Sequence, residues 1–369
     1  MQQFLDLGKR ILLEGDVKFN ERTKQGTISK FGEMSRYSFE NGFPILTTRP
    51  VGIQTSAKEM FWFMRGERNL ASLFKQGVHF WEGNGFDMYL RRHSLHDKFE
   101  KGTNEWSKER DKYKNNLKNV EGFAEKEGDL GPIYGYQWRH WEKFVQDENG
   151  NWVRNEVDQL KRAIDKLKTN PTSRQNIVTA WNAGDIDDMA LPPCHTLFQF
   201  NVVGDNLDLL MFQRSCDVHL GVPYNITGYS LMLGLIAKEV GLNPRNFVHQ
   251  YGDTHFYLGF APRSEFLADS DNLLQFRDGL GHARTSKDYD DLRAWYKSNS
   301  PPEAPELVGS DLIPAFLEQL AREPLKRPNL EITSDDSFYD IIQQHPRKVL
   351  RLEDYSPHSK LIEPVRMAI

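Results

Sequence analysis

The chain has 369 residues, which is enough for one large core with insertions or for two domains. Its hydrophobic content of 38% is ordinary for a globular protein, and no stretch approaches the roughly 20 apolar residues that a membrane span requires, so a membrane protein is excluded. The formal net charge of −5 argues against broad nucleic-acid binding but allows local basic pockets for a small phosphorylated ligand.

The first fifteen residues predict a helix. Phe4, Leu5, Ile11 and Leu12 recur at helical spacing among charged residues, and Gly15 is suited to end the helix. A secretory signal would instead have an uninterrupted apolar segment. We therefore expect a cytoplasmic protein.

Two segments predict insertions. Residues 93–128 are dense in Lys, Glu, Asp and Asn, which is typical of a surface excursion. Residues 261–327 mix short amphipathic pieces with the break at Pro301-Pro302. We expect one domain over residues 1–369 that these two insertions interrupt, and we assign the second insertion no chemistry.

An amphipathic helix is predicted between Glu156 and Asn170. Val157, Leu160, Ile164 and Leu167 fall on one helical face, and a proline follows Asn170.

The next segments predict a sheet with a buried helix. Runs of β-type residues begin at Asn176, Thr196 and Leu207, and a Gly-Asp-Asn turn separates the last two. Residues 224–240 are apolar over much of the helical circumference and stop at Gly241, as in a helix packed deep against a sheet. The expected fold class is α+β.

The two cysteines of the chain, Cys194 and Cys216, are too few for a disulfide framework and suit a reducing compartment. Cys194 and His195 stand between a proline pair and a predicted strand, where a turn could present the thiol at a sheet end. In isolation this pair is weak evidence, because free cysteine is often a core residue.

A second motif, QRSCDVHLGVPYNITGY, supplies groups suited to a nucleotide. Arg214 and Ser215 suit a phosphate dianion, and a cation close to a cysteine favours its thiolate. The amide of Asn225 offers an acceptor and two donors, which match the N3–H and O4 of uracil. Cytosine reverses that pattern.

The motifs PPCH, QRSCD, LGVPYNI and GDTHFY occur in this order, preceded by ERTKQGT, KEMFWFMRGERN and GDLGPIYGYQWRHW. On these residues the chain resembles the thymidylate synthase family over most of residues 1–260 and again near the C-terminus. The resemblance implies a central mixed β-sheet with packed helices, including a buried central helix, and a homodimer. It also implies one-carbon transfer from 5,10-methylenetetrahydrofolate to C5 of dUMP, without a metal.

The resemblance implies that Cys194 adds to C6 of dUMP, so that C5 can attack the one-carbon unit. Glu59 lies among apolar helix residues, and its burial would raise its pKa. Besides Cys194, the implied catalytic residues are Glu59, Tyr134, Asn225 and Arg214. The implied substrate-binding residues are Arg22, Arg174 (from the partner subunit), Gln213, Arg214, Ser215, Asp217, Asn225, His255 and Tyr257. The implied folate-binding residues are Trp81, Asp217, Leu220, Gly221, Tyr224, Arg49 and Ile369.

Several positions depart from the family pattern. Gln175 stands where a second arginine is usual, His219 and Tyr224 replace phenylalanines, and Arg49 replaces a lysine. Arg366 adds a charge to the C-terminal lid, whose closure decides whether hydride or water reaches the methylene intermediate.

These departures leave two products open. The first choice is reductive methylation, which gives dTMP and dihydrofolate. The alternative is a dUMP hydroxymethylase, which gives 5-hydroxymethyl-dUMP and tetrahydrofolate. Asn225 argues against a dCMP hydroxymethylase. A nucleic-acid-binding regulator on the same fold is a remote third reading, because fold alone does not determine function.

Overall fold

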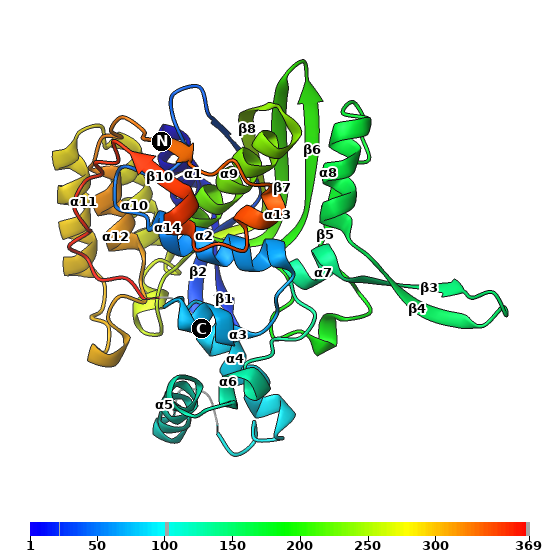
Figure 1. Ribbon diagram of the computed structural model, residues 1–369. Helices are drawn as coiled ribbons and strands as arrows, with labels where there is room; N and C mark the ends of the chain where they lie inside the picture. The colour runs from blue at the N-terminus through cyan, green and yellow to red at the C-terminus, as the bar shows by residue number, and fades with distance from the viewer. Residues whose placement is uncertain (22, 100–102, 367–369) are drawn as a thin grey trace.

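The computed structural model describes residues 1–21, 23–99 and 103–366 (Figure 1). Its centre is a mixed six-stranded sheet in the order β1-β2-β8-β7-β6-β5. β7 and β8 run parallel, and the other neighbouring pairs of this sheet run antiparallel. The strands are β1 (Asp16–Asn20), β2 (Gln25–Ser38), β5 (Ile177–Thr179), β6 (His195–Val203), β7 (Asn206–Asp217) and β8 (Asn243–Tyr257).

The predicted neighbouring strands are confirmed. β6 and β7 form a hairpin in which Val203 pairs with Asn206 across a two-residue turn. Gly204 has a φ of 57° there, which suits glycine. The run that begins at Asn176 forms the short edge strand β5 beside β6.

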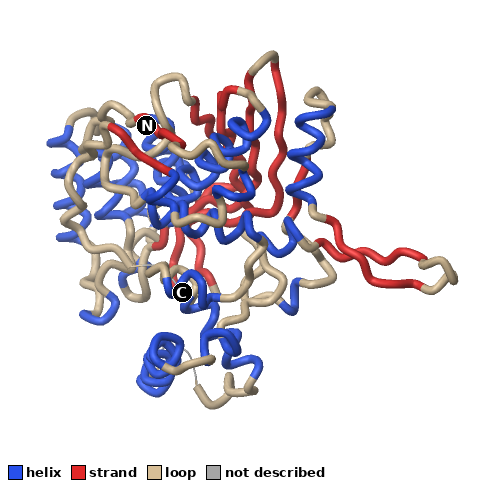
Figure 2. Tube along the Cα trace, viewed as in Figure 1, coloured by secondary structure: helices blue, strands red, loops and turns tan. Residues whose placement is uncertain are grey.

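The predicted buried helix is α9 (Gly221–Val240), which packs on β7, β8 and helix α2 (Ile53–Arg65). Its residues from Ile226 to Ala237 are buried. Gly241 ends it in a left-handed conformation with a φ of 70°. Figure 2 shows both helices in front of the sheet.

The other predicted helices are also present. α1 (Gln2–Glu14) buries Phe4, Leu5, Ile11 and Leu12 and ends before Gly15. α8 (Gln159–Thr169) is shorter than the predicted helix, because residues up to Val157 belong to strand β4. The remaining helices are α3 (Leu70–Lys75), α4 (Glu82–Arg92), α5 (Asn104–Asn119), α6 (Phe123–Glu127), α7 (Gly135–Arg139), α10 (Ser270–His282), α11 (Ser286–Asn299), α12 (Ile313–Leu320), α13 (Phe338–Ile341) and α14 (Pro346–Val349).

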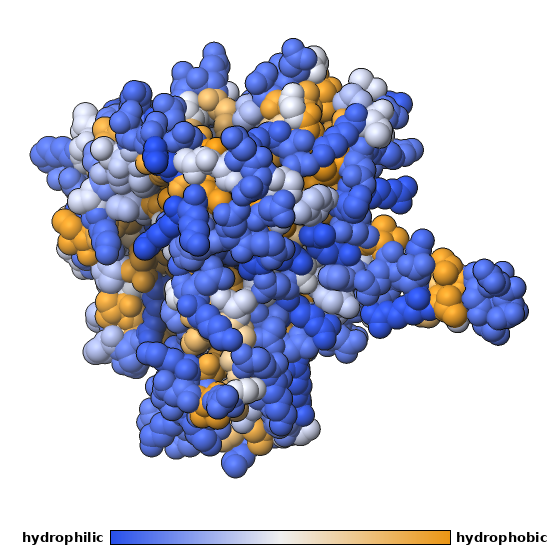
Figure 3. Space-filling view, viewed as in Figure 1, coloured by the Kyte–Doolittle hydropathy of each residue, from blue (hydrophilic) through white to orange (hydrophobic). Residues whose placement is uncertain are grey.

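A hairpin of two strands, β3 (Trp141–Gln146) and β4 (Trp152–Val157), projects from the body of the molecule (Figure 1). Its side chains Phe144 and Trp152 are 64% and 68% exposed, and Figure 3 shows hydrophobic surface on this arm. A second small sheet pairs β9 (Asn329–Ile332) with β10 (Leu350–Glu353).

The two segments expected as insertions both form helices. α5 and α6 lie at the periphery (Figure 1). α12, by contrast, is buried along most of its length, and its Phe316 ring lies 5.9 Å from that of Phe4 and 4.7 Å from that of Phe256. Part of residues 261–327 therefore belongs to the main core. None of the helices in the described part of the chain combines the length and hydropathy needed to span a bilayer.

Candidate active site

Cys194 lies directly before β6, in the turn that follows two prolines. Its backbone N–H donates to the phenol oxygen of Tyr134 at 2.7 Å, and its carbonyl accepts from the backbone N–H of Arg214 at 2.8 Å. Cys194 is partly exposed, whereas Cys216 is fully buried. The more accessible thiol of the two is therefore the one that sequence reasoning selected.

Arg214 is held against the same turn. Its Nε donates to the carbonyl of Pro193 at 3.0 Å, and its Nη2 donates to that of Pro192 at 2.6 Å. Its guanidinium also lies 5.6 Å from the ring centre of Trp181. These contacts keep a positive charge beside Cys194, where it can attract an anionic ligand.

Tyr134 occupies strained backbone with a φ of 35°. Its ring stacks on Phe63 at 4.9 Å and lies 5.3 Å from the ring of Trp81. The close approach requires glycine next in the chain, because a Cβ on Gly135 would lie 1.9 Å from the carbonyl oxygen of Phe63. Burial raises the pKa of the Tyr134 phenol well above 10, so it stays protonated at neutral pH.

Glu59 lies on α2, is half-buried, and directly precedes the buried Met60. Its Oε1 accepts a hydrogen bond from Nε1 of Trp81 at 2.9 Å. Burial, opposed by that hydrogen bond, raises the pKa of Glu59 from 4.5 to about 7. The expected effect of the apolar surroundings is thus present, and this carboxyl can give or take a proton near neutral pH.

Asn225 lies in α9 beside His195. Its Oδ1 is buried and makes no well-formed hydrogen bond within the described residues. Burial, and to a lesser extent the charge of Arg214, lower the pKa of His195 to about 3 against the opposing effect of Asn225, so the imidazole is neutral. A buried acceptor without a partner is costly unless a ligand supplies a donor, and an imide N–H would do so.

Asp217 ends β7 and shapes the turn into α9. Its Oδ1 accepts from the backbone N–H groups of His219 and Leu220 at 3.0 and 2.9 Å. Burial raises the pKa of Asp217 above its usual value. Arg49 reaches the same turn, because its Nη2 donates to the carbonyl of His219 at 2.5 Å. Gly221 begins α9, and the ring of Tyr224 contacts that of Phe80 at 5.2 Å.

The parallel strands β7 and β8 bring further predicted residues to the same sheet end. Asp217 pairs with His255, whose ring lies 5.1 Å from that of Tyr257. Ser215 lies two residues before Asp217 and accepts at its carbonyl from Nε2 of Gln213 at 3.0 Å. The sheet register therefore places these side chains around one region.

His255 itself is paired with an acid. Its Nδ1 lies 2.9 Å from Oδ1 of Asp253. Burial would raise the pKa of Asp253, but His255 and Lys18 outweigh it and lower the value to about 2. The pairing fixes the orientation of the His255 ring.

Arg174 stands apart from this group. Its side chain is exposed, and its carbonyl accepts from Nε2 of Gln199, about 15 Å along the strand from Cys194. The structure thus does not bring Arg174 to Cys194 within one subunit. Gln175, the departure beside it, accepts from Nζ of Lys166 at 2.9 Å, so a cation lies at this surface. Arg22 and Ile369 lie outside the described residues.

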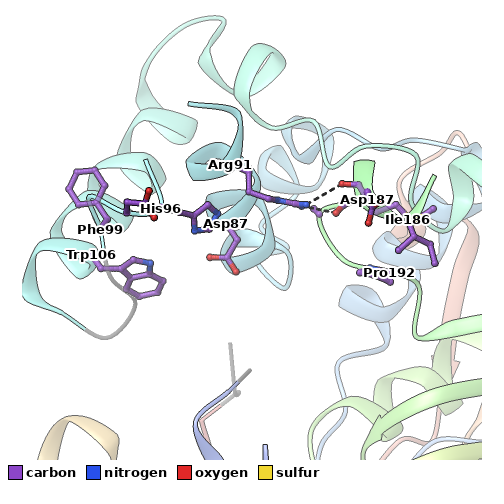
Figure 4. Close-up of a pocket in the computed structure, with 11 residues that line it drawn as sticks. Asp87, Arg91, His96, Phe99, Trp106, Ile186, Asp187 and Pro192 are labelled. Atoms are coloured by element: carbon purple, nitrogen blue, oxygen red, sulfur yellow. Dashed lines mark hydrogen bonds between the residues drawn. The ribbon is translucent and has the colours of Figure 1, made fainter. Parts of the chain in front are cut away.

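A cavity of about 790 Å³ adjoins the turn before Cys194 (Figure 4). Pro192 and Asp187 line one side, and His96 and Trp106 line the other. Arg91 crosses between them and donates to the carbonyls of Asp187 and Met189. Some residues of the segment 93–128, which was expected as a surface insertion, therefore line a cavity beside the candidate site.

Sequence reasoning missed two contributors to this site. The ring of Trp181 contacts the Arg214 guanidinium, and the carbonyl of Pro193 accepts a hydrogen bond from Nε of Arg214. An isolated tryptophan and a backbone carbonyl leave no motif, so no sequence signal could have identified them.

A partly exposed thiol, a fixed cation and a carboxyl with a pKa of about 7 define an enzyme site of the nucleophilic type. The family model described as thymidylate synthase matches residues 2–367, and the chain belongs to this family. It is 41% identical over 268 residues to the thymidylate synthase of Listeria monocytogenes serotype 4a (strain HCC23), a match that covers 70% of this chain and 82% of that protein. The thymidylate synthase of Listeria innocua serovar 6a matches with the same identity and coverage.

Proposed function

We propose that the chain is a thymidylate synthase, which transfers a one-carbon unit from 5,10-methylenetetrahydrofolate to C5 of dUMP and releases dTMP and dihydrofolate. The observation that carries this proposal is the buried Oδ1 of Asn225, which has no well-formed hydrogen bond among the described residues and lies close to His195, the residue after Cys194. The relatives named thymidylate synthase support methylation. The hydroxymethylase alternative is not favoured.

The chemistry begins when the sulfur of Cys194 bonds to C6 of the uracil ring and the electron pair of the C5–C6 double bond moves toward C5 and O4. C5 then attacks the methylene carbon of the folate, whose bond to N10 has opened with a proton taken up at N10, so that the carbon now bridges C5 and N5. Loss of the C5 proton and release of tetrahydrofolate give an exocyclic methylene. Hydride from tetrahydrofolate converts it to a methyl group as the S–C6 bond breaks. Glu59, with its pKa of about 7, would exchange protons at O4.

The remaining roles divide by ligand. Asp217 lies between the residues assigned to the nucleotide and those assigned to the folate, because the turn that it shapes leads into α9. We assign the nucleotide phosphate to Arg22, Arg174, Arg214, Ser215 and Gln213, and the deoxyribose to His255 and Tyr257. We assign the folate to Trp81, Asp217, Leu220, Gly221, Tyr224, Arg49 and Ile369.

The test is product analysis with the intact protein. Incubation with dUMP and methylenetetrahydrofolate should give dTMP and dihydrofolate in equal amounts, identified by mass and by the absorbance rise of dihydrofolate. Formation of 5-hydroxymethyl-dUMP without dihydrofolate would contradict the proposal, since no hydride would then have left the folate.

Asn225→Asp should relax discrimination between uracil and cytosine. A carboxyl presents a different set of donors and acceptors to the ring, so kcat/KM for dUMP should fall by about 100-fold and some dCMP should be used. Competition between the two nucleotides measures the ratio. An unchanged preference for dUMP would mean that another group reads the ring.

We also propose a homodimer that forms through the sheet face opposite α9. Met34, Gln250, Phe212 and Leu197 lie side by side across four strands. Met34 is 55% exposed, and the other three are only partly buried. A sheet face that leaves apolar side chains partly exposed is suited to form an interface with a second copy of the chain. The two free thiols further support a protein of the reducing cytoplasm.

Mixing two inactive variants tests whether Arg174 acts across the interface. A hybrid of Cys194→Ser and Arg174→Glu subunits would contain one intact site only if the partner supplies the arginine. Equal mixing should then restore roughly a quarter of the wild-type activity, because half of the dimers are hybrids with one working site each. No recovery after verified subunit exchange would place Arg174 in its own subunit's site or outside the site.

A further inference from the structure

The C-terminal segment, residues 358–366, is bound by a buried carboxylate of α12. Glu318, which is 5% exposed, accepts from the backbone N–H of Ile362 at 2.9 Å and from that of Glu363 at 3.0 Å. Hydrogen bonds from amides to a buried carboxylate are strong, and their loss leaves the amides without partners. Glu318 therefore holds the chain a few residues before its end.

Arg322, one turn further along the chain, completes this contact. Its Nη2 donates to Oε1 of Glu318 at 2.6 Å. Its Nη1 donates to the carbonyls of Ser359 and Thr48 at 2.6 and 3.0 Å. One guanidinium thus joins α12, the C-terminal segment and the loop that contains Arg49.

Helix α11 adds further contacts from the same inserted region. Nζ of Lys297 lies 2.8 Å from Oε1 of Glu363, and Nη1 of Arg293 lies 3.5 Å from Glu318. The backbone N–H of Arg366 donates to the carbonyl of Gly309 at 2.7 Å. Residues 293–322 therefore bind the C-terminal segment at several successive positions.

The same helix touches the candidate folate turn. Nε2 of Gln319 donates to Oγ1 of Thr48 at 2.7 Å, which fixes the residue before Arg49. Arg49 in turn holds the carbonyl of His219. The ring of Phe316 packs edge-on against that of His219 at 6.1 Å. A continuous set of contacts thus connects Glu318 to the turn that Asp217 shapes.

We propose that Glu318 and Arg322, here called the α12 clamp, position the C-terminal segment and the 217–220 turn for the folate cosubstrate. The proposal rests on the proposed thymidylate synthase function. The clamp residues are positioning residues, since they act through Thr48 and Arg49 and through the backbone of residues 359–363. The segment to which we assigned no chemistry from sequence therefore determines how well folate is bound.

Glu318→Gln tests the clamp, because the amide keeps the size of the side chain but replaces one acceptor oxygen with a donor. Hydrogen–deuterium exchange at Ile362 and Glu363 should accelerate, while exchange in α9 stays unchanged. The KM for methylenetetrahydrofolate should rise about 10-fold, and the dissociation constant for dUMP should stay within about 2-fold. Asp288→Asn is the matched control, because Asp288 also accepts from two backbone N–H groups but at the exposed start of α11.

The outcomes separate the two proposals. An inactive wild-type protein would refute the proposed function, whatever the exchange data show. An active wild type whose Glu318→Gln variant shows unchanged exchange and an unchanged folate KM would overturn the clamp, as would equal losses for folate and dUMP. If Glu318→Gln does not fold, Arg322→Lys gives the same measurements, because lysine keeps the charge but lacks the forked donors that reach the carbonyls of Ser359 and Thr48. A rise in the folate KM that is smaller than expected, with no change in the dUMP dissociation constant, still supports the clamp. An unchanged folate KM refutes it.

Discussion

Replacing Cys194 with serine should abolish turnover while the protein keeps its fold and binds dUMP. A hydroxyl is far less nucleophilic than a thiolate at neutral pH. The contacts of Cys194 with Tyr134 and Arg214 involve its backbone and survive the change. We expect kcat to fall by a factor of about 1000 or more. Steady-state dihydrofolate formation and dUMP titration measure the two effects.

Cys216→Ala is the control for this variant. Cys216 is fully buried, and its thiol donates to the carbonyl of Gln213 at 3.3 Å. Its loss should cost about 1 kcal/mol of stability and leave kcat within a few-fold of wild type. Equal losses at both cysteines would remove the basis for assigning the nucleophile to Cys194.

Glu59→Gln should lower kcat by a factor of about 100 to 10,000 and should also change how stability depends on pH. The folded pKa of Glu59, about 7, lies above its ordinary value of 4.5. The neutral carboxyl therefore makes its full contribution to the free energy of unfolding below pH 4.5, and this contribution is lost as pH rises to 7. Glutamine resembles the neutral carboxyl and keeps the acceptor for Trp81 at every pH.

Urea unfolding of both proteins between pH 4.5 and pH 8 measures this effect. Relative to Glu59→Gln, the wild type should lose on the order of 3 kcal/mol across this range, with little further change above pH 7. A constant difference between the two proteins would show that Glu59 ionises normally. A variant with unimpaired turnover would remove Glu59 from the mechanism.

The elements with strong local signals were predictable from sequence. α9 is apolar around its circumference and stops at a glycine, so its burial follows from residues 224–241 alone. The β6–β7 hairpin follows from two β-type runs around a short turn. The site residues were predicted from motifs, and the structure brings Cys194, Tyr134 and Arg214 into contact.

Other features depend on contacts between distant segments or were overlooked. The β3–β4 hairpin has a readable turn signal at Asp147–Gly150, yet it was not predicted, and its strand β4 shortened the helix expected from Glu156. The role of α12 could not be predicted, because Glu318 contacts backbone N–H groups that carry no residue-specific signal. Composition identified the insertion, but only the fold shows what it contacts.

The pairing of β2 with β8 has a consequence for how the chain is made. Thr27 pairs with Tyr257, so β2 gains this neighbour only after more than half of the chain has been translated. At about 5–20 residues per second, the edge of β2 that later pairs with β8 stays without this partner for roughly 10–40 seconds during synthesis. An open strand edge is a template for pairing with other chains. The nascent polypeptide is therefore most exposed to aggregation before β8 emerges, and chaperones that bind early in synthesis would protect it there.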